Sequence, residues 1–321
     1  MNFAQWLLAL SSLGLVLLGL LFIAALMVYG ERRILALLQD RLGPNRAGPF
    51  GLLQPIADFL KLLTKEHFVP PFADRNIYII APIIVPFTAL LSFVVVPVSD
   101  DWWLADLNIA LLFILALSSL RVYGIVLGGW ASNSKYPLFG GLRSAAQMIS
   151  YELPMGLALM GVIILSGSFS LVDIVAAQEL PFIILQPIGF TIFLVCGIAE
   201  TNRLPFDLPE AENELASGYN TEYGDIKFAF YYLGEYIGVL LIAVLITVLF
   251  LGGWHGPWIP GVFWFMLKTL TLIFLFFWLR TSLPRLRYDQ LMNCGWKFLL
   301  PAALINLLVT AFLGLFWMEG Q

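Results

Sequence analysis

The first residues that could carry chemistry are a run of carboxylates between positions 199 and 225. This stretch reads AETNRLPFDLPEAENELASGYNTEYGD and sets seven acidic residues against one base, Arg203. The acidic residues are Glu200, Asp207, Glu210, Glu212, Glu214, Glu222 and Asp225. Because crowded carboxylates raise one another's pKa, some of them should exchange protons near neutral pH. The pattern therefore favours a proton path or a site for a basic partner.

Local structure explains only part of this run. Asp207 is a candidate N-cap, with Glu210 three residues later and Gly218 closing the helix. Glu210 and Glu214 would then share a helix face, where like charges destabilise. The carboxylates left without a local explanation are Glu200, Glu212, Glu214 and Glu222. A plain solvated loop is the simpler alternative to a proton path.

Four more ionisable residues lie inside segments that are otherwise apolar. Glu152 and Glu235 each lie about two turns into such a segment, and Arg121 and Lys268 lie deeper. A charge at the centre of a membrane helix costs roughly 2.5–3.5 kcal/mol on insertion scales, so it usually faces a protein interior and carries function. We expect Glu152 and Glu235 to join the acidic run in one proton path. The alternative is a static ion pair, such as Glu152 with Arg121.

A basic loop and an amphipathic segment follow the first apolar stretch. Residues 41–49 read RLGPNRAGP, an irregular loop in which Arg41 and Arg46 meet either anionic headgroups or a ligand. Residues 49–66 place apolar side chains at helical spacing, which predicts a helix lying in the membrane interface. Its apolar positions are Leu52, Ile56, Phe59, Leu60 and Leu63. This helix either seals a bundle or forms the lip of a lateral opening for a lipid-like substrate.

Several kinds of redox and metal site are excluded by the residues that are present. The chain has two Cys, Cys196 and Cys294, and two His, His67 and His255. These are too few for a four-thiolate iron–sulfur site or a His-rich metal site. The sequence contains no dinucleotide fingerprint, P-loop or zinc motif. We therefore expect no catalytic residue, metal or cofactor in this chain, and any redox function must come from partner subunits.

The composition identifies the setting in which these residues act. The chain has 321 residues, of which 60% are hydrophobic and only 12% are charged, whereas a soluble domain has roughly 25% charged residues. This excludes a soluble enzyme, a disordered chain and, with a net charge of −4, a nucleic-acid-binding module. We expect an all-α polytopic membrane protein forming a single membrane domain over residues 1–321.

Hydropathy predicts eight transmembrane helices, each about 20 apolar residues long. Their approximate ranges are 4–29, 78–98, 104–128, 145–167, 181–199, 228–251, 262–281 and 297–318. Lys and Arg are concentrated in the 1–2, 3–4, 5–6 and 7–8 connections, which are therefore expected on the cytoplasmic side. Both termini are then periplasmic, and the interfacial helix at 49–66 is cytoplasmic.

Three cytoplasmic stretches carry a specific resemblance. They are GERRILALLQDRLGPNRAGPFGLLQPIADFLKLLTKE (30–66), AETNRLPFDLPEAENELASGYNTEY (199–223) and LRTSLPRLRYDQLM (279–292). In sequence, order and spacing they resemble the NADH dehydrogenase subunit 1 family, the H-type membrane subunit of proton-translocating NADH:quinone oxidoreductase (respiratory complex I). The similarity covers essentially the whole chain. The short termini favour a bacterial member, expected in the cytoplasmic (inner) membrane.

The resemblance implies a translocase subunit without a redox centre that forms the quinone chamber where the membrane meets the hydrophilic arm. Its partners would be the other membrane subunits and the arm subunits that hold FMN and the iron–sulfur clusters, with quinone as substrate. Carried over to this chain, the quinone-binding residues are Arg32, Arg41, Arg46, Phe228, Arg280 and Arg285. The residues of the proton path are Glu152, Glu200, Asp207, Glu210, Glu212, Glu214, Glu222, Glu235 and Asp289, the last expected to pair with a nearby Arg.

Two alternatives remain open on the sequence alone. One is the homologous membrane subunit of an energy-converting hydrogenase, which would bring nickel–iron partners in place of NADH- and quinone-linked ones. The other is a stand-alone ion transporter, which would move ions in liposomes without partner subunits.

Overall fold

The computed structural model describes residues 3–100, 102–209 and 216–318, and over these ranges the fold is helical with no β-strand. The helices are α1 (Phe3–Leu38), α2 (Gln54–Thr64), α3 (Arg75–Ser92), α4 (Ala110–Ala131), α5 (Lys135–Ser166), α6 (Leu171–Ala176), α7 (Phe182–Leu185), α8 (Pro187–Glu200), α10 (Ile226–Phe250), α11 (Gly261–Ser282), α12 (Tyr288–Asn293) and α13 (Leu300–Met318). A π-helical turn, Cys294–Leu299, joins α12 to α13. The predicted all-α membrane class is confirmed for these ranges.

Seven helices in the described ranges are long and apolar enough to cross a membrane. They correspond to seven of the eight predicted spans, and the largest differences are at the end of the first span, which continues to Leu38 instead of 29, and at the starts of the fourth and the last. The fourth span begins at Lys135, ten residues before its predicted start, because its first turns are helical and pack closely against the turn Gly218–Asn220, and Ser144 accepts a hydrogen bond from Asn202. The last begins at Tyr288, because α12, the π turn and α13 form one continuous helical segment.

The predicted span at 181–199 is interrupted. Pro187 disfavours helical backbone at the residue before it, and Gln186 has φ −131° and ψ 61°. The segment therefore consists of the four-residue α7 and the 14-residue α8. By length α8 falls short of the about 20 residues that a span requires, so the count of eight crossings remains a prediction.

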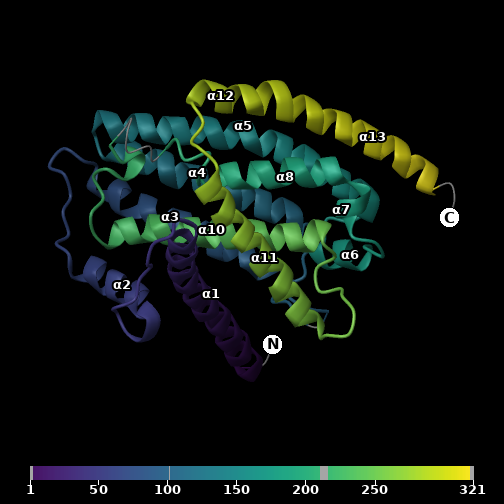
Figure 1. The fold of residues 1–321 in the computed structure, drawn as a ribbon, viewed down its shortest axis with the longest axis horizontal. Coiled ribbons are helices and arrows are strands. Elements are labelled where there is room, and N and C mark those ends of the chain that lie inside the picture. Colours follow the sequence, from purple (N-terminus) through teal and green to yellow (C-terminus); the bar gives the residue numbers. More distant parts are fainter. Residues whose placement is uncertain (1–2, 101, 210–215, 319–321) are drawn as a thin grey trace.

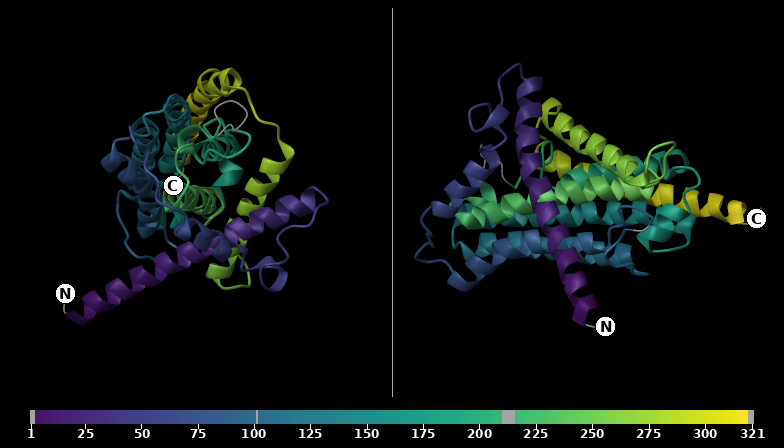
Figure 2. Two further views of the ribbon diagram at one scale, coloured as in Figure 1. Left: turned by 90° about the vertical axis from the view of Figure 1, so that its left-hand side faces the viewer. Right: turned by 90° about the horizontal axis from the view of Figure 1, so that it is seen from below.

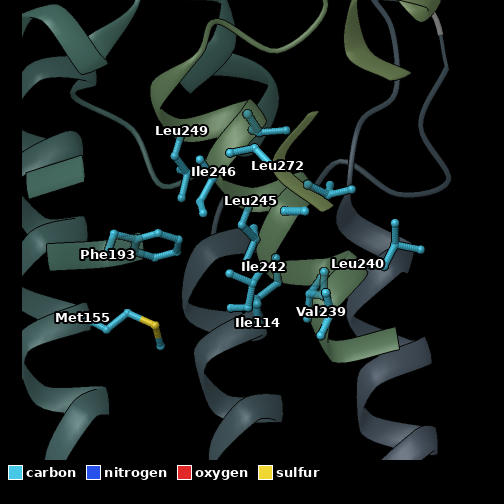
Figure 3. Packing of buried hydrophobic residues seen from close by; sticks show 14 of the residues in the cluster. Ile114, Met155, Phe193, Val239, Leu240, Ile242, Leu245, Ile246, Leu249 and Leu272 are labelled. Carbon is cyan, nitrogen blue, oxygen red and sulfur yellow. The ribbon is translucent and has the colours of Figure 1, made fainter. Parts of the chain in front are cut away.

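Helix α10 forms the centre of the bundle. It runs beside α3 and α8, with α5 beyond α8 (Figure 1). Its apolar side chains are buried on all sides from Gly234 to Phe250. Figure 3 shows Ile242, Leu245 and Leu249 of α10 among Ile114 of α4 and Phe193 of α8. An apolar helix that is buried all round is typical of a central membrane helix.

Helix α1 lies obliquely across this bundle, as both views of Figure 2 show. Its main contacts are with α10, α11 and α2. The face that it buries repeats at helical spacing through Leu20, Ala24, Met27 and Glu31. Several of its other apolar side chains, among them Leu15, Leu18 and Phe22, are exposed, as expected for a helix that faces lipid. A 36-residue helix is long enough to span the bilayer with a strong tilt.

The predicted amphipathic helix is present as α2, preceded by the 3-10 turn Pro49–Gly51. None of its residues is buried, and Ile56, Phe59 and Leu60 are all more than half exposed. Its polar face turns toward the end of α1, where Asp58 accepts a hydrogen bond from Arg32. The helix is confirmed, and its place in the membrane interface remains a prediction.

Candidate functional site

A chain of buried ion pairs joins four elements near one end of the bundle. Arg280 of α11 contacts the Glu31 carboxylate of α1. Nη1 of Arg203, in the connection after α8, lies 3.7 Å from the same carboxylate. Nη2 of Arg203 lies 3.1 Å from Oε2 of Glu235 on α10, and Tyr219 donates a 3.0 Å hydrogen bond to Oε1 of Glu235. We call Glu31, Arg280, Arg203 and Glu235 the central ion network.

Three of the four members of the central ion network are almost fully removed from solvent, and the fourth, Arg280, is 24% exposed. The side chains of Glu31, Arg203 and Glu235 are 5%, 9% and 2% exposed. A buried charge is tolerated only when a partner compensates its lost hydration, and here each carboxylate has a guanidinium partner. Arg203 also lies over the rings of Tyr232 and Tyr236, at 5.6 and 4.5 Å from their centroids. In such a low-dielectric setting, a charge change at one member strongly affects the others.

Glu31 is the member of this network that sequence reasoning missed. The predicted first span ends at 29, which places Glu31 just outside it. The helix continues to Leu38, and Glu31 lies four residues after Met27 on the buried face. A signal is present in the sequence, because Leu20, Ala24, Met27 and Glu31 recur at one helical spacing.

A second ion pair lies near the start of the connection between α8 and α10, residues 201–225, which we call the acidic connection. Nη2 of Arg285 lies 3.1 Å from Oδ2 of Asp207, and the backbone N–H of Leu286 donates to the carbonyl of Pro205. Burial raises the pKa of Asp207 to about 6, even though the Arg285 guanidinium opposes the shift. Asp207 is therefore an acid that titrates close to neutrality. Its predicted role as a helix cap with Glu210 lies partly outside the described residues.

The remaining acids of the connection fall into different surroundings. Glu210, Glu212 and Glu214 lie outside the described residues. Glu222 is half-buried, and its backbone carbonyl accepts a 2.7 Å hydrogen bond from Tyr78. Glu200 is 5% exposed at the end of α8.

Asp225 has a structural role at the start of α10. It accepts hydrogen bonds from the backbone N–H and the Nζ of Lys227 at 3.0 and 2.7 Å, and it lies 2.9 Å from Nδ1 of His67. Burial favours its protonated form, but the bonds with Lys227 and His67 outweigh it and hold the pKa of Asp225 below its usual range. Asp225 is therefore an ionised N-cap rather than an acid that exchanges protons near neutrality.

Three of the four deep charges predicted from the sequence each have a different arrangement. Glu235 belongs to the central ion network. Glu152 lies 3.4 Å from the hydroxyl of Ser119, and within the described ranges it forms no ion pair with Arg121, so that static pair is wrong. Lys268 donates to the carbonyls of Leu251, Gly253 and His255 after the end of α10, which is a structural role.

The residues predicted to bind quinone are not all brought together. Arg32 lies 2.6 Å from Asp58 and is about half exposed, and Arg41 and Arg46 are exposed on the loop that precedes α2. Phe228 packs against Tyr232 near the start of α10. Arg280 and Arg285 face Glu31 and Asp207 instead of an open site. Asp289 lies 3.3 Å from Arg287, so the expected pairing is present, but both side chains are largely exposed.

An apolar cavity of about 560 Å³ lies between α1, α10, α11 and the segment 93–104. Of its lining side chains in the described ranges, those with a polar atom are Thr269, Trp102 and Trp103. Gly30 and Ile34 line it on α1, on either side of Glu31 in the sequence. The cavity therefore extends along lipid-facing helices to the turn of α1 that holds the central ion network. A long apolar chain is the ligand that such a lining fits.

Comparison with known proteins gives a consistent result over nearly the whole chain. Residues 11–311 match the family described as NADH dehydrogenase. The chain is 54% identical over 314 residues to the H-type subunit, numbered 1, of NADH-quinone oxidoreductase from Geobacter metallireducens, covering 95% of each protein. It is 54% identical over 317 residues to the H-type subunit numbered 2 of Syntrophobacter fumaroxidans, covering 96% of each. It is 53% identical to the H-type subunit of Syntrophotalea carbinolica, covering 93% of this chain and 94% of the relative.

These similarities span the helices, the acidic connection and the central ion network together. The family match over residues 11–311 includes every residue of the site. The chain therefore belongs to the NADH dehydrogenase family, as a multi-pass membrane protein related to the H-type subunit of NADH-quinone oxidoreductase.

Proposed function

We propose that this chain forms the quinone chamber of a proton-translocating NADH:quinone oxidoreductase in the cytoplasmic membrane of a bacterium. The observation that carries the proposal is the position of the central ion network beside the apolar cavity. Glu31 lies between Gly30 and Ile34 on α1, and both of these line the cavity. The apolar tail of a quinone therefore fits the cavity, and its polar, protonatable head group fits the neighbouring ion network.

Quinone would enter from the bilayer beside α1. Its tail is held by the apolar cavity, and its head group lies toward Arg32 near the end of α1 and toward the loop that carries Arg41 and Arg46. Phe228 flanks this path near the start of α10. Arg280 and Arg285 act on it through the carboxylates with which they pair, Glu31 and Asp207. Electrons come from iron–sulfur clusters and FMN in partner subunits; this chain has two Cys, too few for a four-thiolate cluster.

Reduction to quinol adds two electrons and two protons at the head group. In a low-dielectric interior, the charge change is felt by the nearby ion pairs. Glu31 and Arg280 transmit it to Arg203, and Arg203 transmits it to Glu235. The further acids of the path are Glu152, Glu200, Asp207, Glu210, Glu212, Glu214 and Glu222, with Asp289 shaping its outer end. Proton movement through these acids continues into the partner membrane subunits.

The topology that this function requires has eight crossings within one membrane domain, residues 1–321. We propose that α7 and α8 together make the interrupted fifth crossing, since α8 packs beside the full-length helices α5 and α10. Both termini are then periplasmic, and α2 lies on the cytoplasmic interface. Figure 1 supports this alternation: the connections after α1, α4 and α8 lie at the same end of the bundle.

The test compares two electron acceptors in membranes that contain the assembled enzyme. Glu31→Gln and Arg280→Gln should abolish most NADH:quinone activity while NADH oxidation by a water-soluble artificial acceptor continues, because that reaction uses only the hydrophilic arm. The matched control is Arg287→Gln, whose side chain is 79% exposed. Undiminished quinone reduction in both network variants would contradict the proposed function.

Further variants test the basic loop before α2 and the acids outside the described residues. Arg41→Ala should raise the apparent KM for short-chain quinones. An unchanged KM in a fully assembled enzyme would show that Arg41 does not line the quinone chamber. Glu212→Gln or Glu214→Gln should lower quinone reduction that is coupled to pumping. Full turnover with full proton stoichiometry would exclude both acids from the path.

A further inference from the structure

A second, much smaller cavity lies within the membrane part of the bundle, where α3, α4, α8 and α10 meet. Its volume is about 10 Å³, close to the ~10–15 Å³ needed to accommodate one water molecule. The polar residues that line it are Thr88, Ser92, Ser118, Arg121 and Glu200. It shares no lining residue with the large apolar cavity.

Two buried charges of opposite sign face this cavity. Arg121 is 4% exposed and Glu200 is 5% exposed. Within the described ranges, Nε and Nη2 of Arg121 and Oε2 of Glu200 have no hydrogen-bond partner, and no ion pair within 4 Å joins the two side chains. A buried ionic group with unsatisfied atoms costs several kcal/mol, so a polar ligand between these two side chains is strongly favoured.

The hydroxyl groups around the cavity are oriented to accept hydrogen bonds from such a ligand. Thr88, Ser92 and Ser118 each donate their hydroxyl proton to a backbone carbonyl of their own helix, at 3.1, 3.0 and 2.9 Å. Each oxygen therefore retains acceptor capacity. Together with the Arg121 donors and the Glu200 acceptor, the lining offers the two to four partners that an internal water requires.

Helix α10 is shaped to admit the Arg121 guanidinium. A Cβ atom added at Gly238 would lie 2.5 Å from Nη1 of Arg121. Glycine at this position therefore allows the cation to lie against the backbone of the central helix. Arg121, Glu200 and Gly238 come from three different helices, so the arrangement depends on the packing of the whole bundle.

We propose that this cavity is a hydrated charge site in which internal water bridges Arg121 to Glu200. Arg121 is a positioning residue: its charge favours the ionised form of Glu200 against the effect of burial, and it fixes the water through which Glu200 exchanges its proton. The site itself does not depend on quinone chemistry, whereas its contribution to proton transfer rests on the proposed function. The ligand class is water or hydronium, because the volume admits nothing larger.

The groups that face Glu200 set the conditions under which it titrates. They are Arg121 from α4, Glu152 from α5 and Cys196 one turn earlier on α8. Arg121 is the one cation among them, so its removal leaves the Glu200 carboxylate with its burial and the Glu152 carboxylate, both of which disfavour its charged form. We therefore expect Glu200 to take up a proton when Arg121 is made neutral.

Infrared difference spectroscopy of the purified complex tests this directly. Arg121→Gln should give a stronger carbonyl band of a protonated carboxyl group than the wild type, and this increase should be absent from Arg121→Gln/Glu200→Gln. Arg121→Lys, which keeps the charge, should show no such increase. Lys268→Gln is the matched control, because it removes a second membrane-embedded cation that caps carbonyls far from Glu200. An Arg121→Gln spectrum identical to that of the wild type would overturn the charge relationship.

The bridging water has its own test, which does not require the charge variants to assemble. Exchange into H₂¹⁸O should shift an internal-water band in the wild type, and Gly238→Ala, which pushes the guanidinium aside, should weaken that band. A high-resolution map with Arg121 and Glu200 in direct contact and no water between them would overturn the bridge. If the complex proves unable to reduce quinone, the proposed function fails while both of these readouts remain decisive for the site.

Discussion

Arg203 places Nη2 at 3.1 Å from Oε2 of Glu235, and this ion pair joins the acidic connection to the central helix of the bundle. The same guanidinium lies 3.7 Å from Glu31 on α1. One cation therefore bridges two buried carboxylates, one beside the apolar cavity and one within the predicted proton path. A change of charge on either side changes the field at the other, which is the physical basis of the coupling that we propose.

Removal of that shared cation should be severely destabilising. Arg203→Ala leaves two buried carboxylates with fewer partners, and breaking a buried pair typically costs about 3–5 kcal/mol. The expected result is little assembled subunit in the membrane, measured by quantifying it in the purified complex. Arg287→Ala, at an exposed ion pair, should assemble normally. Normal assembly of Arg203→Ala would show that the pairing contributes little.

Loss of a single hydrogen bond to Glu235 should have a graded effect. Tyr219→Phe removes the 3.0 Å bond that stabilises the Glu235 carboxylate, and a hydrogen bond to a charged group contributes about 1.5–3 kcal/mol. We expect the subunit to assemble but to show a lower heat-inactivation midpoint and slower quinone reduction, because the buried Glu235 carboxylate loses a hydrogen-bond donor. An unchanged midpoint and unchanged turnover would show that this hydrogen bond contributes little to the central ion network.

The stability of the subunit should vary with pH through Asp207. Its pKa is raised from 3.8 to about 6, so the folded state binds its proton more tightly than the unfolded state does. Protonated Asp207 therefore adds to the free energy of unfolding. This contribution is ~3 kcal/mol, is complete below pH 3.8 and is lost as the pH rises through about 6. Asp207→Asn should remove this slope from the heat-inactivation midpoint measured across that range. Parallel pH curves for the two proteins would contradict the assignment.

Packing around the tyrosines at the start of α10 should tolerate no added methyl group. A Cβ at Gly128 would overlap the phenol oxygen of Tyr231, which donates to the Gly124 carbonyl at 3.2 Å. Gly128→Ala should cost about 1–3 kcal/mol, seen as a lower heat-inactivation midpoint. Gly156→Ala in α5, where no atom lies within 4 Å of the new Cβ, is the control and should be neutral or stabilising by about 0.5–1 kcal/mol. Equal midpoints for the two variants would contradict this packing account.

Hydropathy and charge predict much of the fold because both follow from transfer to the bilayer. The same criteria misplace the start of α5, whose first turns are stabilised by tertiary contacts such as the hydrogen bond from Asn202 to Ser144, across 58 residues, and the close approach of Gly140 to the Tyr219 backbone. They also treat 181–199 as one span, although Gln186-Pro187 divides it. Local sequence determines where a helix is interrupted, but only tertiary packing determines which polar turns remain helical.

The site is predictable in its residue types and less so in its pairings. The residues 199–225 and Glu235 stand out because carboxylates are rare in apolar sequence. The pairings within the central ion network cannot be recognised in this way. Glu31 and Arg280, for example, are 249 positions apart in the sequence and meet only because α1 crosses α11. The pairing of Asp289 with Arg287 is predictable because the two residues are neighbours on one turn.

The central claim is that the network around Glu235 couples quinone reduction to proton movement. Proton uptake per electron and NADH:quinone turnover should be measured together in sealed vesicles that contain the complex with Glu235→Gln. Glu179→Gln, an exposed acid after α6, is the control. The account predicts that Glu235→Gln loses both quinone turnover and pumping while the control keeps them. Full turnover with an unchanged proton-to-electron ratio in Glu235→Gln would contradict the account.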